Sequence, residues 1–367
     1  MLTAGNAGDT PQGRKGARMP QQPIFPHVTV VLGDPRLADP SKREGAFHEE
    51  DLVTRDTMKA AFASLDGYTF RYLDDHTTIL EDLRAGRPQF VVNFCDTGFG
   101  NDPLRELNLP AYLEMLDVPY SGAPPSAMVL SWDKAVVRAM AADLGIAVPD
   151  EVYIRVGDDV GASLPDRYPA FVKPSCADGS VGITVDAIVR NRAQAVARVK
   201  RVQAELPGRA VLVQEFLPGA EYGIGVIGNP GPGFTVLPPL EVDYDGLDPA
   251  LPRLLGFESK ALPDSPYWTD VRFREARLDQ AARATIEVAA AAMFERLGLR
   301  DYGRFDFRTG ADGVIKLMEV NPNPAWANDG KLAFMAGFAG IEYRDMLRMI
   351  LEAAQSRAAA ERGLVQV

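Results

Sequence analysis

The residues best placed to do chemistry lie in residues 302–324, where two alternating segments flank an Asp-Gly pair (YGRFDFRTGADGVIKLMEVNPNP). The dipeptide Asp312-Gly313 is typical of a two-residue hairpin turn. Such a turn places residue 311 opposite residue 314 and fixes every other opposed pair along the two strands. We therefore expect one antiparallel hairpin with a defined register.

In that register Asp306 faces Glu319 and Arg304 faces Asn321. Side chains two residues apart share one face of a strand, so all four polar groups are expected together. The opposite face then carries Phe305, Phe307, Met318 and Val320. Two carboxylates and an amide oxygen suit Mg²⁺, with Mn²⁺ as a substitute, and Arg304 beside them could hold an anionic intermediate.

Two alternatives to this metal site stay open. An ordinary hairpin with a solvated polar face would show the same alternation. A four-residue loop would shift the opposed pairs, although Glu319 and Asn321 would still share a face.

Apolar periodicity predicts the elements that must position the hairpin. Strands and helices alternate in the first part of the chain, which predicts a parallel sheet built from βαβ units. The strands are expected at 28–33, 68–73 and 90–94, and the helices at 47–65 and 77–84. A cluster of Gly and Pro at 119–125 precedes a predicted domain boundary near residue 130.

The remainder of the chain predicts antiparallel α+β structure. Expected strands lie at 151–155, 169–174, 210–217, 222–228, 234–243, 302–308 and 314–320. Expected helices lie at 133–144, 191–205, 273–297 and 342–360. Residues 243–268 show no steady period and predict a long functional loop, such as a lid.

Composition narrows the class of function. With 367 residues and 46% hydrophobic content, the chain can bury a core divided into two or three units. A net charge of −11 disfavours nucleic acid and anionic membranes as partners. Two cysteines, Cys95 and Cys176, fit a reducing, cytoplasmic setting. The longest apolar helical stretch, 286–294, is far shorter than a membrane span, so none is expected.

Ordered motifs resemble the ATP-grasp superfamily, and in particular the D-alanyl-D-alanine ligase group, over roughly residues 28–355. In order along the chain they are Asp133-Lys134, FVKP with Lys173, the loop ADGSVGIT, the hinge VLVQEFLPGAEY, Lys260, GRFDF and EVNPNP. The resemblance implies an N-terminal α/β pre-ATP-grasp domain with a parallel sheet, followed by a two-part ATP-grasp clamp. We expect the first domain at 25–130, the clamp at 131–358 (parts 131–220 and 221–358), and a tail at 359–367. Residues 1–24 are expected to form a disordered extension, and they lack the apolar core of a secretory signal.

The resemblance also implies a nucleotide site. The residues that match the family's ATP-binding positions are Lys134, Lys173, Gly179, Gln214, Phe216, Leu217, Glu221 and Lys260. Lysines suit phosphate oxygens, and the glycine loop lets backbone N–H groups approach a phosphate. Gln214, Phe216 and Leu217 match the family's adenine positions, and Glu221 matches its ribose position. A solvent-exposed role is the alternative for any single lysine.

The mechanism implied is attack of a substrate carboxylate on the γ-phosphate of ATP, which gives an acyl phosphate and ADP. An amine then displaces phosphate to form an amide. Arg304 is the candidate for stabilising the oxyanion, with Lys260 and Ser180 as further catalytic candidates. The resemblance suggests a homodimer through the first domain.

Some segments depart from the family pattern. Where D-alanine-specific members carry a His-Gly motif after the third strand, this chain reads NFCDTGFGNDP at 93–103, with Cys95 or Asp96 near the histidine position. The three histidines, His27, His48 and His76, lie elsewhere, so a histidine base requires His48 to fold back into the site.

The substrate-binding candidates follow from the same comparison. Glu50, with Glu49 close behind, is the candidate for binding the amino group of the first substrate. Asp96 is a further candidate, and Trp326 offers an apolar or cation-binding wall. Gly330 and Lys331 lie where the family receives the carboxylate of the second substrate. Asp329 is also foreign to the D-alanine pattern.

Three functions remain open at this point. The first is a ligase of two amino acids, either two D-alanines or, as we favour, a different pair. The second is a nucleotide-binding regulatory protein without catalysis. The third is an ATP-grasp kinase or carboxylase that acts on a small acid.

Overall fold

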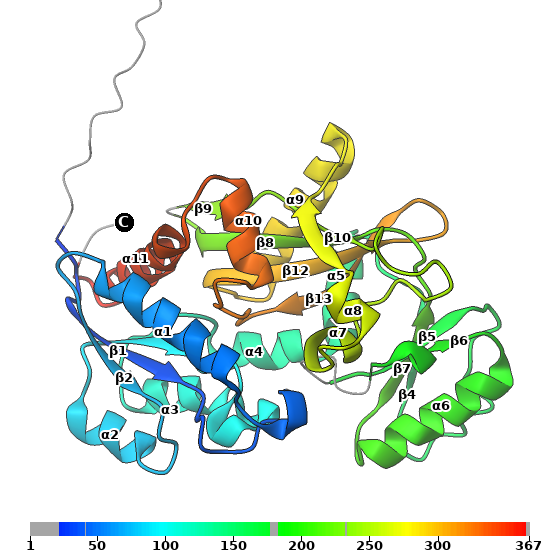
Figure 1. The fold of residues 1–367 in the computed structure, drawn as a ribbon, viewed down its shortest axis with the longest axis horizontal. Helices are drawn as coiled ribbons and strands as arrows, with labels where there is room; N and C mark the ends of the chain where they lie inside the picture. Colours follow the sequence, from blue (N-terminus) through cyan, green and yellow to red (C-terminus); the bar gives the residue numbers. More distant parts are fainter. Residues whose placement is uncertain (1–21, 41, 177–182, 232, 365–367) are drawn as a thin grey trace, which may run out of the picture.

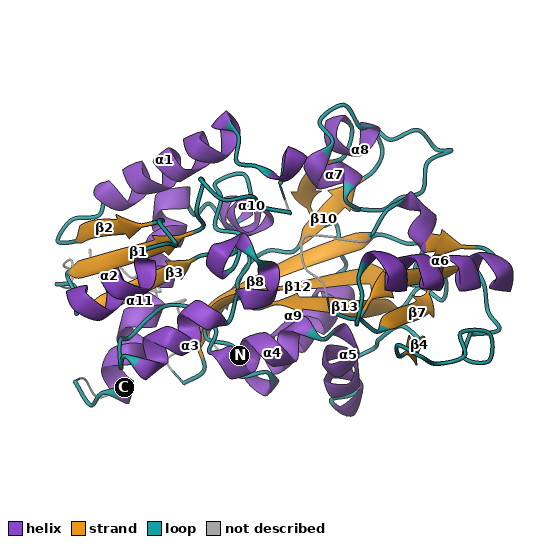
Figure 2. Cartoon of the chain, turned by 90° about the horizontal axis from the view of Figure 1, so that it is seen from below, coloured by secondary structure: helices purple, strands orange, loops and turns teal. Residues whose placement is uncertain are grey.

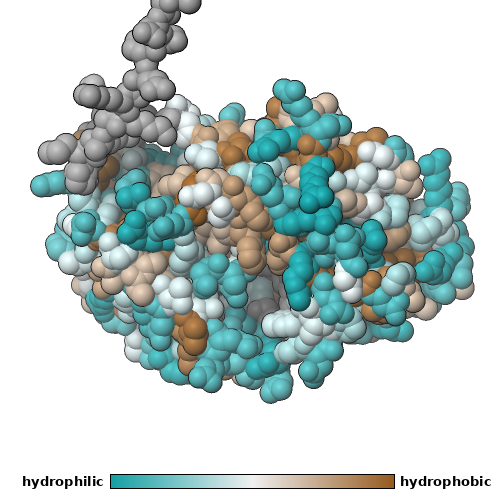
Figure 3. All heavy atoms as spheres, turned by 45° about the horizontal axis from the view of Figure 1, so that its top comes forward, coloured by the Kyte–Doolittle hydropathy of each residue, from teal (hydrophilic) through white to brown (hydrophobic). Residues whose placement is uncertain are grey.

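A computed structural model describes residues 22–40, 42–176, 183–231 and 233–364. These described residues form three β-sheets with helices packed around them, and the third sheet, which contains the hairpin, lies between the other two (Figures 1 and 2). Most of the predicted extension at 1–24 lies outside the described residues. Hydrophilic side chains cover much of the face shown in Figure 3.

The first sheet is parallel, as the βαβ pattern predicts. Its strand order is β2 (Thr69–Leu73), β1 (His27–Leu32), β3 (Phe90–Phe94). The helices of this region are α1 (Glu49–Ala63), α2 (Ile79–Gly86), α3 (Asn108–Met115) and α4 (Pro125–Trp132). The short 3₁₀ helix η1 (Arg43–Gly45) precedes α1.

The second sheet is antiparallel. Its order is β4 (Glu151–Ile154), β7 (Val211–Glu215), β5 (Ala170–Pro174), β6 (Ile188–Val189). The long helix α6 (Arg192–Glu205) packs against it, and α5 (Lys134–Asp143) leads into it. Apolar residues between 152 and 213 form its own core cluster.

The third sheet is antiparallel and carries the predicted hairpin. Its order is β11 (Arg272–Glu275), β10 (Leu240–Asp243), β8 (Glu221–Asn229), β12 (Asp301–Thr309), β13 (Ile315–Asn321), with β9 (Gly233–Val236) also paired to β8. The helices around it are α7 (Glu258–Ala261), α8 (Pro266–Thr269), α9 (Gln280–Arg296), α10 (Lys331–Phe338) and α11 (Tyr343–Glu361).

Several predicted elements were wrong in detail. The single strand expected at 234–243 is two strands, β9 and β10, and the loop at 243–268 contains α7 and most of α8. The helix expected from 273 begins only at Gln280, because the Asp279 side chain accepts the N–H of Ala282 and caps it there. Helices α3, α4 and α10 were not predicted; in α4 Pro125 occupies the first turn, where proline does not break a helix.

The largest core cluster joins the first sheet to the third. It includes Val30 and Phe94 of the first sheet, Leu240 of the third, and Met346 and Leu351 of α11. Helix α11 also packs against α1, so the last helix contacts the first one (Figure 1). The three sheets fall inside the ranges 25–130, 131–220 and 221–358, but the shared core crosses these limits, which stay a prediction.

No helix in the described part of the chain is both long enough and apolar enough to cross a membrane.

Candidate active site

A cavity of ≈ 1220 Å³ lies where the three sheets approach one another. Residues from the second and third sheets, from the carboxyl end of β1 and from α1 all line it. Most of the predicted site residues lie on its walls: Glu50, Asp96, Lys134, Lys173, Gln214, Phe216, Leu217, Glu221, Arg304, Asp306, Glu319, Asn321, Trp326 and Lys331.

The hairpin forms the predicted residue pairs, but with a different loop and with a bulge. The N–H of Gly310 donates to the carbonyl of Val314 at 2.8 Å, and Gly313 has φ 79°, so the loop has three residues and not the predicted two. This loop alone would shift the register by one residue. A β-bulge between Asp306 and Phe307 corrects the shift, because Phe307 faces Leu317 while Asp306 faces Glu319.

The bulge also moves Met318, which was predicted on the core face. Met318 lines the cavity, and Leu317 joins Phe305, Phe307 and Val320 in the core beneath the site. Arg304 therefore faces Asn321 as predicted, with one apolar residue added to the cavity wall.

The four polar side chains of the hairpin gather as expected. Arg304 donates through Nε and Nη2 to the two oxygens of Asp306 at 2.9 and 3.0 Å, and Asn321 Nδ2 donates to Asp306 Oδ2 at 3.3 Å. Asp306 is 4% exposed, which excludes the solvated hairpin face. A buried, charge-assisted cluster of this kind fixes the orientation of each member.

Two lysines extend the cluster from the second sheet side. Lys134 Nζ lies 3.4 Å from Glu319 Oε2, and Lys173, the last but one residue of β5, is almost fully buried. Burial, together with the charge of Lys134, lowers the pKa of Lys173 to about 8, although Glu319 and Glu151 oppose this. Burial disfavours ionisation of Glu319, yet Lys134, Lys173 and Arg304 together hold its pKa below the ordinary value despite the charge of Asp306.

Local folding explains the position of Lys134. Asp133 caps α5 by accepting the N–H groups of Ala135 and Val136. Ser175, just after β5, donates its hydroxyl to Asp133 at 2.8 Å, and the N–H of Lys134 donates to the Ser175 carbonyl at 3.1 Å. These bonds hold the start of α5 against the end of β5, so both lysines reach the same wall.

The hinge residues lie where β7 ends and β8 begins. Gln214 Nε2 donates to Glu151 Oε2 at 2.6 Å, so its carbonyl oxygen is directed to other partners. Glu221 accepts from Tyr244 Oη at 3.0 Å and from Arg308 Nη1 at 3.2 Å. Glu221 is buried and bonded on one oxygen, which orients its second oxygen.

The substrate candidates that precede residue 130 also line the cavity. Glu50 is in the first turn of α1, 3.6 Å from Arg43. His48 also lines the cavity as the N-cap of α1, with Nε2 3.0 Å from the Arg43 carbonyl, so it does fold back to the site. At the histidine position of the family, Asp96 lines the cavity, whereas Cys95 is buried. Burial raises the pKa of the Cys95 thiol well above its usual range.

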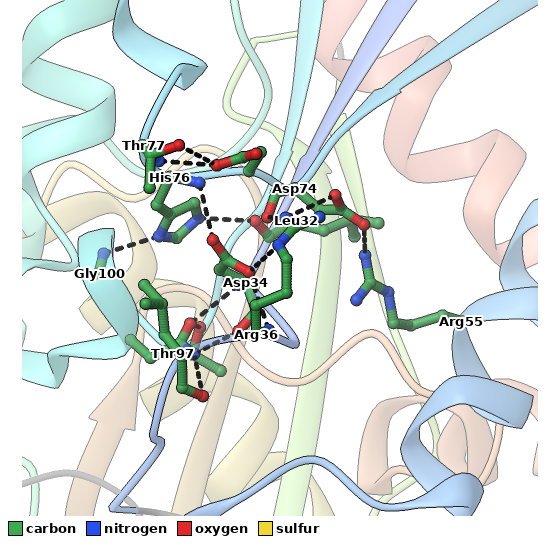
Figure 4. A network of polar contacts seen from close by, with 12 residues as sticks. Leu32, Asp34, Arg36, Arg55, Asp74, His76, Thr77, Thr97 and Gly100 are labelled. Atoms are coloured by element: carbon green, nitrogen blue, oxygen red, sulfur yellow. Dashed lines mark hydrogen bonds and ion pairs between the residues drawn. The ribbon is translucent and has the colours of Figure 1, made fainter.

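A polar network holds the loop that carries Asp96 (Figure 4). His76 Nδ1 accepts the N–H of Gly100 at 2.7 Å, which assigns the ring proton to Nε2, and Nε2 donates to the Leu32 carbonyl at 2.9 Å. Asp34 accepts the N–H of His76 at 2.9 Å. The network ties the loop after β3 to the end of β1.

Trp326 and Lys331 follow the hairpin. The Trp326 indole donates to the Phe94 carbonyl at 2.8 Å and stacks on the Phe94 ring with centroids 5.5 Å apart. Lys331 is the first residue of α10, and Gly330 is the N-cap before it and does not line the cavity. Gly179, Ser180 and the side chain of Lys260 lie outside the described residues.

Comparisons with known proteins decide the family. Residues 142–352 match the family model described as D-ala D-ala ligase C-terminus. The chain belongs to this family. It is 26% identical to the D-alanine–D-alanine ligase of Actinobacillus pleuropneumoniae serotype 5b (strain L20) over 84% of this chain and 95% of the relative. It is 28% identical to the uncharacterized protein y4sG of Sinorhizobium fredii (strain NBRC 101917 / NGR234) over 69% of this chain and 71% of the relative.

Solved structures confirm the predicted fold class. The D-alanine–D-alanine ligase of Bacillus anthracis complexed with ATP superimposes with a TM-score of 0.66 at 20% identity, covering 91% of this chain and 99% of that one. The VanG D-Ala:D-Ser ligase of Enterococcus faecalis gives a TM-score of 0.65 at 19% identity, covering 90% and 99%. Family membership confirms the prediction of an ATP-dependent, amide-forming ligase of the D-alanine–D-alanine ligase type.

The donor set of this ligase fits a hard divalent cation. In the described part of the chain no three His, Cys, Asp or Glu side chains gather as metal ligands, so the predicted set depends on Asn321 as its third member. The Asn321 amide nitrogen faces Asp306, which leaves its carbonyl oxygen for another partner. The lowered pKa of Glu319 keeps this carboxylate ionised, as a metal ligand must be. A carboxylate such as Asp306 offers about four lone pairs, so the bonds that Asp306 makes to Arg304 and Asn321 leave room for a metal.

Among the residues in or beside the cavity, Arg308, Tyr244 and Met318 were missed in the sequence. Arg308 lies two residues after Asp306 and so on the same face of β12, a signal that strand alternation contains. Tyr244 comes from the aperiodic loop and gave no signal. Met318 could not be placed because the bulge is not visible in the pattern of apolar residues.

Proposed function

We propose that this ligase joins the carboxylate of one amino acid to the amine of a second, and that the pair is not two D-alanines. What supports the reaction is the convergence of Lys134, Lys173 and Arg304 on two carboxylates in one cavity. What supports a different pair is the set of departures at the substrate end: Asp96, Trp326 and Lys331 line the cavity.

In this proposal Lys134 and Lys173 bind phosphate oxygens of ATP from the second sheet side. The side-chain carbonyl oxygen of Gln214 accepts a hydrogen bond from the amino group of adenine, and Glu221 accepts one from ribose. The bonds of Gln214 to Glu151 and of Tyr244 to Glu221 support these roles, because they orient both side chains. Nucleotide and substrate carboxylate are then held in one cavity, which lowers the entropic cost of their reaction.

Asp306, Glu319 and Asn321 would hold Mg²⁺, or Mn²⁺ in its place. The metal supplies charge neutralisation on the phosphate groups. Arg304 is kept in one orientation by its two bonds to Asp306, and it stabilises the oxyanion formed when the amine attacks the acyl phosphate. Lys260 and Ser180, which lie outside the described side chains and residues, remain proposed catalytic contributors.

At the substrate end, Glu50 accepts the ammonium group of the first substrate, and Asp96 and Trp326 form the wall that selects its side chain. The fixed indole offers an apolar face and the Asp96 carboxylate an acidic one. A small, neutral side chain such as that of alanine would leave both surfaces unused.

A screen of amino-acid pairs tests the proposal. Purified enzyme is incubated with ATP, Mg²⁺ and every pair of a D- and L-amino-acid panel, and ADP release and product mass are measured. We expect ADP release only when two different amino acids are present, with a product mass equal to their sum less water. ADP release with one small acid alone would indicate a kinase. ADP release with D-alanine as the only amino acid would contradict the proposal that the two substrates differ. No ADP release with any substrate would indicate a binding protein.

We further propose a cytoplasmic homodimer formed through the first domain. Light scattering coupled to size-exclusion chromatography gives the mass in solution. A mass of one chain would contradict the dimer and leave the ligase proposal untouched.

A further inference from the structure

Lys331 lies against the third sheet, beside two carboxylates that its sequence context did not indicate. It is the first residue of α10, which packs on β8, β10 and β11. Its Nζ lies 3.8 Å from Glu221 Oε1 and 4.0 Å from Asp306 Oδ2, and 5.9 Å from the centre of the Phe273 ring. The side chain is 17% exposed, so these contacts lie within the cavity and not at its rim.

The two carboxylates beside Lys331 come from neighbouring strands. Glu221 begins β8 and Asp306 lies in β12, where Arg308 pairs with Glu221 and Asp306 pairs with Gly223. Both are buried, and each carries a different proposed task, Glu221 at the ribose and Asp306 at the metal. A triphosphate that runs from ribose to metal must therefore pass the ammonium group that lies between them.

We infer that Lys331 binds phosphate groups of the nucleotide and does not hold the carboxylate of the second substrate. The inference rests on the proposed nucleotide site. Lys134 and Lys173 approach the phosphates from the second sheet side, whereas Lys331 approaches from the third sheet side. The triphosphate is then held by cations on both walls of the cavity.

Charge balance supports this assignment. Glu221 and Asp306 are carboxylates beside the path of a polyphosphate and would repel it, and their partners Arg308 and Arg304 offset part of that repulsion. Lys331 lies within 4.0 Å of both and offsets that repulsion in addition to binding phosphate. Both effects have the same sign, so removal of this charge weakens binding of phosphorylated nucleotides.

Direct binding measurements test the inference. The dissociation constants of ADP and adenosine are measured by calorimetry or by displacement of a fluorescent nucleotide, for the wild type, Lys331→Met and Lys331→Arg. The control is Lys200→Met, a change at an exposed lysine of α6, a helix that contributes no residue to the cavity lining. Thermal unfolding of each variant checks that it is folded.

We expect Lys331→Met to weaken ADP binding by about tenfold or more, the effect of losing one charge-assisted contact. Adenosine binding should change by less than about twofold, because it carries no phosphate. Lys331→Arg should restore most of the ADP affinity, and Lys200→Met should match the wild type.

Unchanged ADP affinity in folded Lys331→Met, with a raised KM for the amine-donating substrate alone, would overturn the inference and return Lys331 to the carboxylate. Equal weakening of ADP and adenosine would also overturn it, since that result indicates a general distortion of the site. If the wild type itself binds neither nucleotide, the proposed nucleotide site fails, which is a separate result.

Discussion

At the scale of single residues, Arg304 is held as a cation of fixed direction. Its two bonds to Asp306 set the plane of the guanidinium, and the core residues Phe305 and Phe307 hold the strand beneath it. A preoriented cation needs no reorganisation when charge develops in a transition state. In the proposed mechanism Arg304 should therefore contribute more to the reaction than to binding of the nucleotide.

Replacing Arg304 with alanine separates these two contributions. Arg304→Ala should lower kcat by about 10²–10³-fold, the range found for loss of one oxyanion-stabilising donor, while the ADP dissociation constant changes little. Steady-state kinetics and calorimetry measure the two quantities. A matched surface change, Arg84→Ala, should alter neither. Equal losses of turnover and nucleotide binding would contradict the proposed role.

Lys173 predicts a pH dependence of nucleotide binding. Its pKa is lowered from 10.5 to about 8 by burial and by Lys134, so the ammonium is mostly charged at pH 7 and loses its charge as pH rises through 8. Phosphate binding requires the charged form, so the affinity for ADP should fall between pH 7 and pH 9, by at most about tenfold per pH unit above the pKa.

The control for this titration is adenosine, whose binding should not follow the ionisation of Lys173. A flat ADP profile across the same range would show that Lys173 keeps its proton or does not contact phosphate. Calorimetry in buffers of matched ionic strength gives both profiles, because salt alone screens phosphate contacts.

At the scale of elements, the hairpin shows both what sequence patterns can predict and where they fail. The pairs Asp306–Glu319 and Arg304–Asn321 were predicted from a two-residue turn that does not exist. They are right because the three-residue loop and the bulge at Met318 offset each other. The bulge shifts the alternation of the two faces by one residue, so Leu317 and Val320 share the core face although they are three positions apart. The adjacent apolar residues Leu317 and Met318 do not indicate which of them faces the core, so the apolar pattern did not locate the bulge.

Helix ends were hidden for a related reason. Residues 272–275 form strand β11, where Arg274 makes ion pairs with Glu241 and Asp243 on β10, partners that are distant in sequence. The helix then begins at a capping residue, Asp279. Local periodicity predicts one continuous helix there, and tertiary pairing decides otherwise.

The cap offers a test confined to one element. Asp279→Ala removes the acceptor for the Ala282 N–H and should lower the free energy of unfolding by about 1 kcal/mol, with a range of about 0.5–2. Urea unfolding measures it. Asp279→Asn, which keeps a capping side chain, should retain most of the stability. Kinetic constants should not change, because α9 lies behind the core and not on the cavity wall.

At the scale of the whole molecule, three sheets bring residues from separate parts of the sequence to one cavity. The parallel sheet, the order of the motifs and the polar cavity residues that the motifs carry could be predicted from the sequence, whereas most lining residues from α1 and from 254–273 could not. The position of Lys331 beside Glu221 and Asp306 could not, because it depends on how α10 packs on the third sheet. The core shared between the first and third sheets could not either, since it depends on α11 returning to α1.

The dependence of nucleotide binding on Mg²⁺ tests the proposed site most directly. The ADP dissociation constant is measured with Mg²⁺ and with a chelator, for the wild type and for Glu319→Gln, which keeps the size of the side chain and removes its charge. The proposed site predicts that Mg²⁺ strengthens ADP binding to the wild type and that Glu319→Gln loses about tenfold or more of this gain, while metal-free binding is retained. The same gain from Mg²⁺ in both proteins would contradict a metal site on the hairpin.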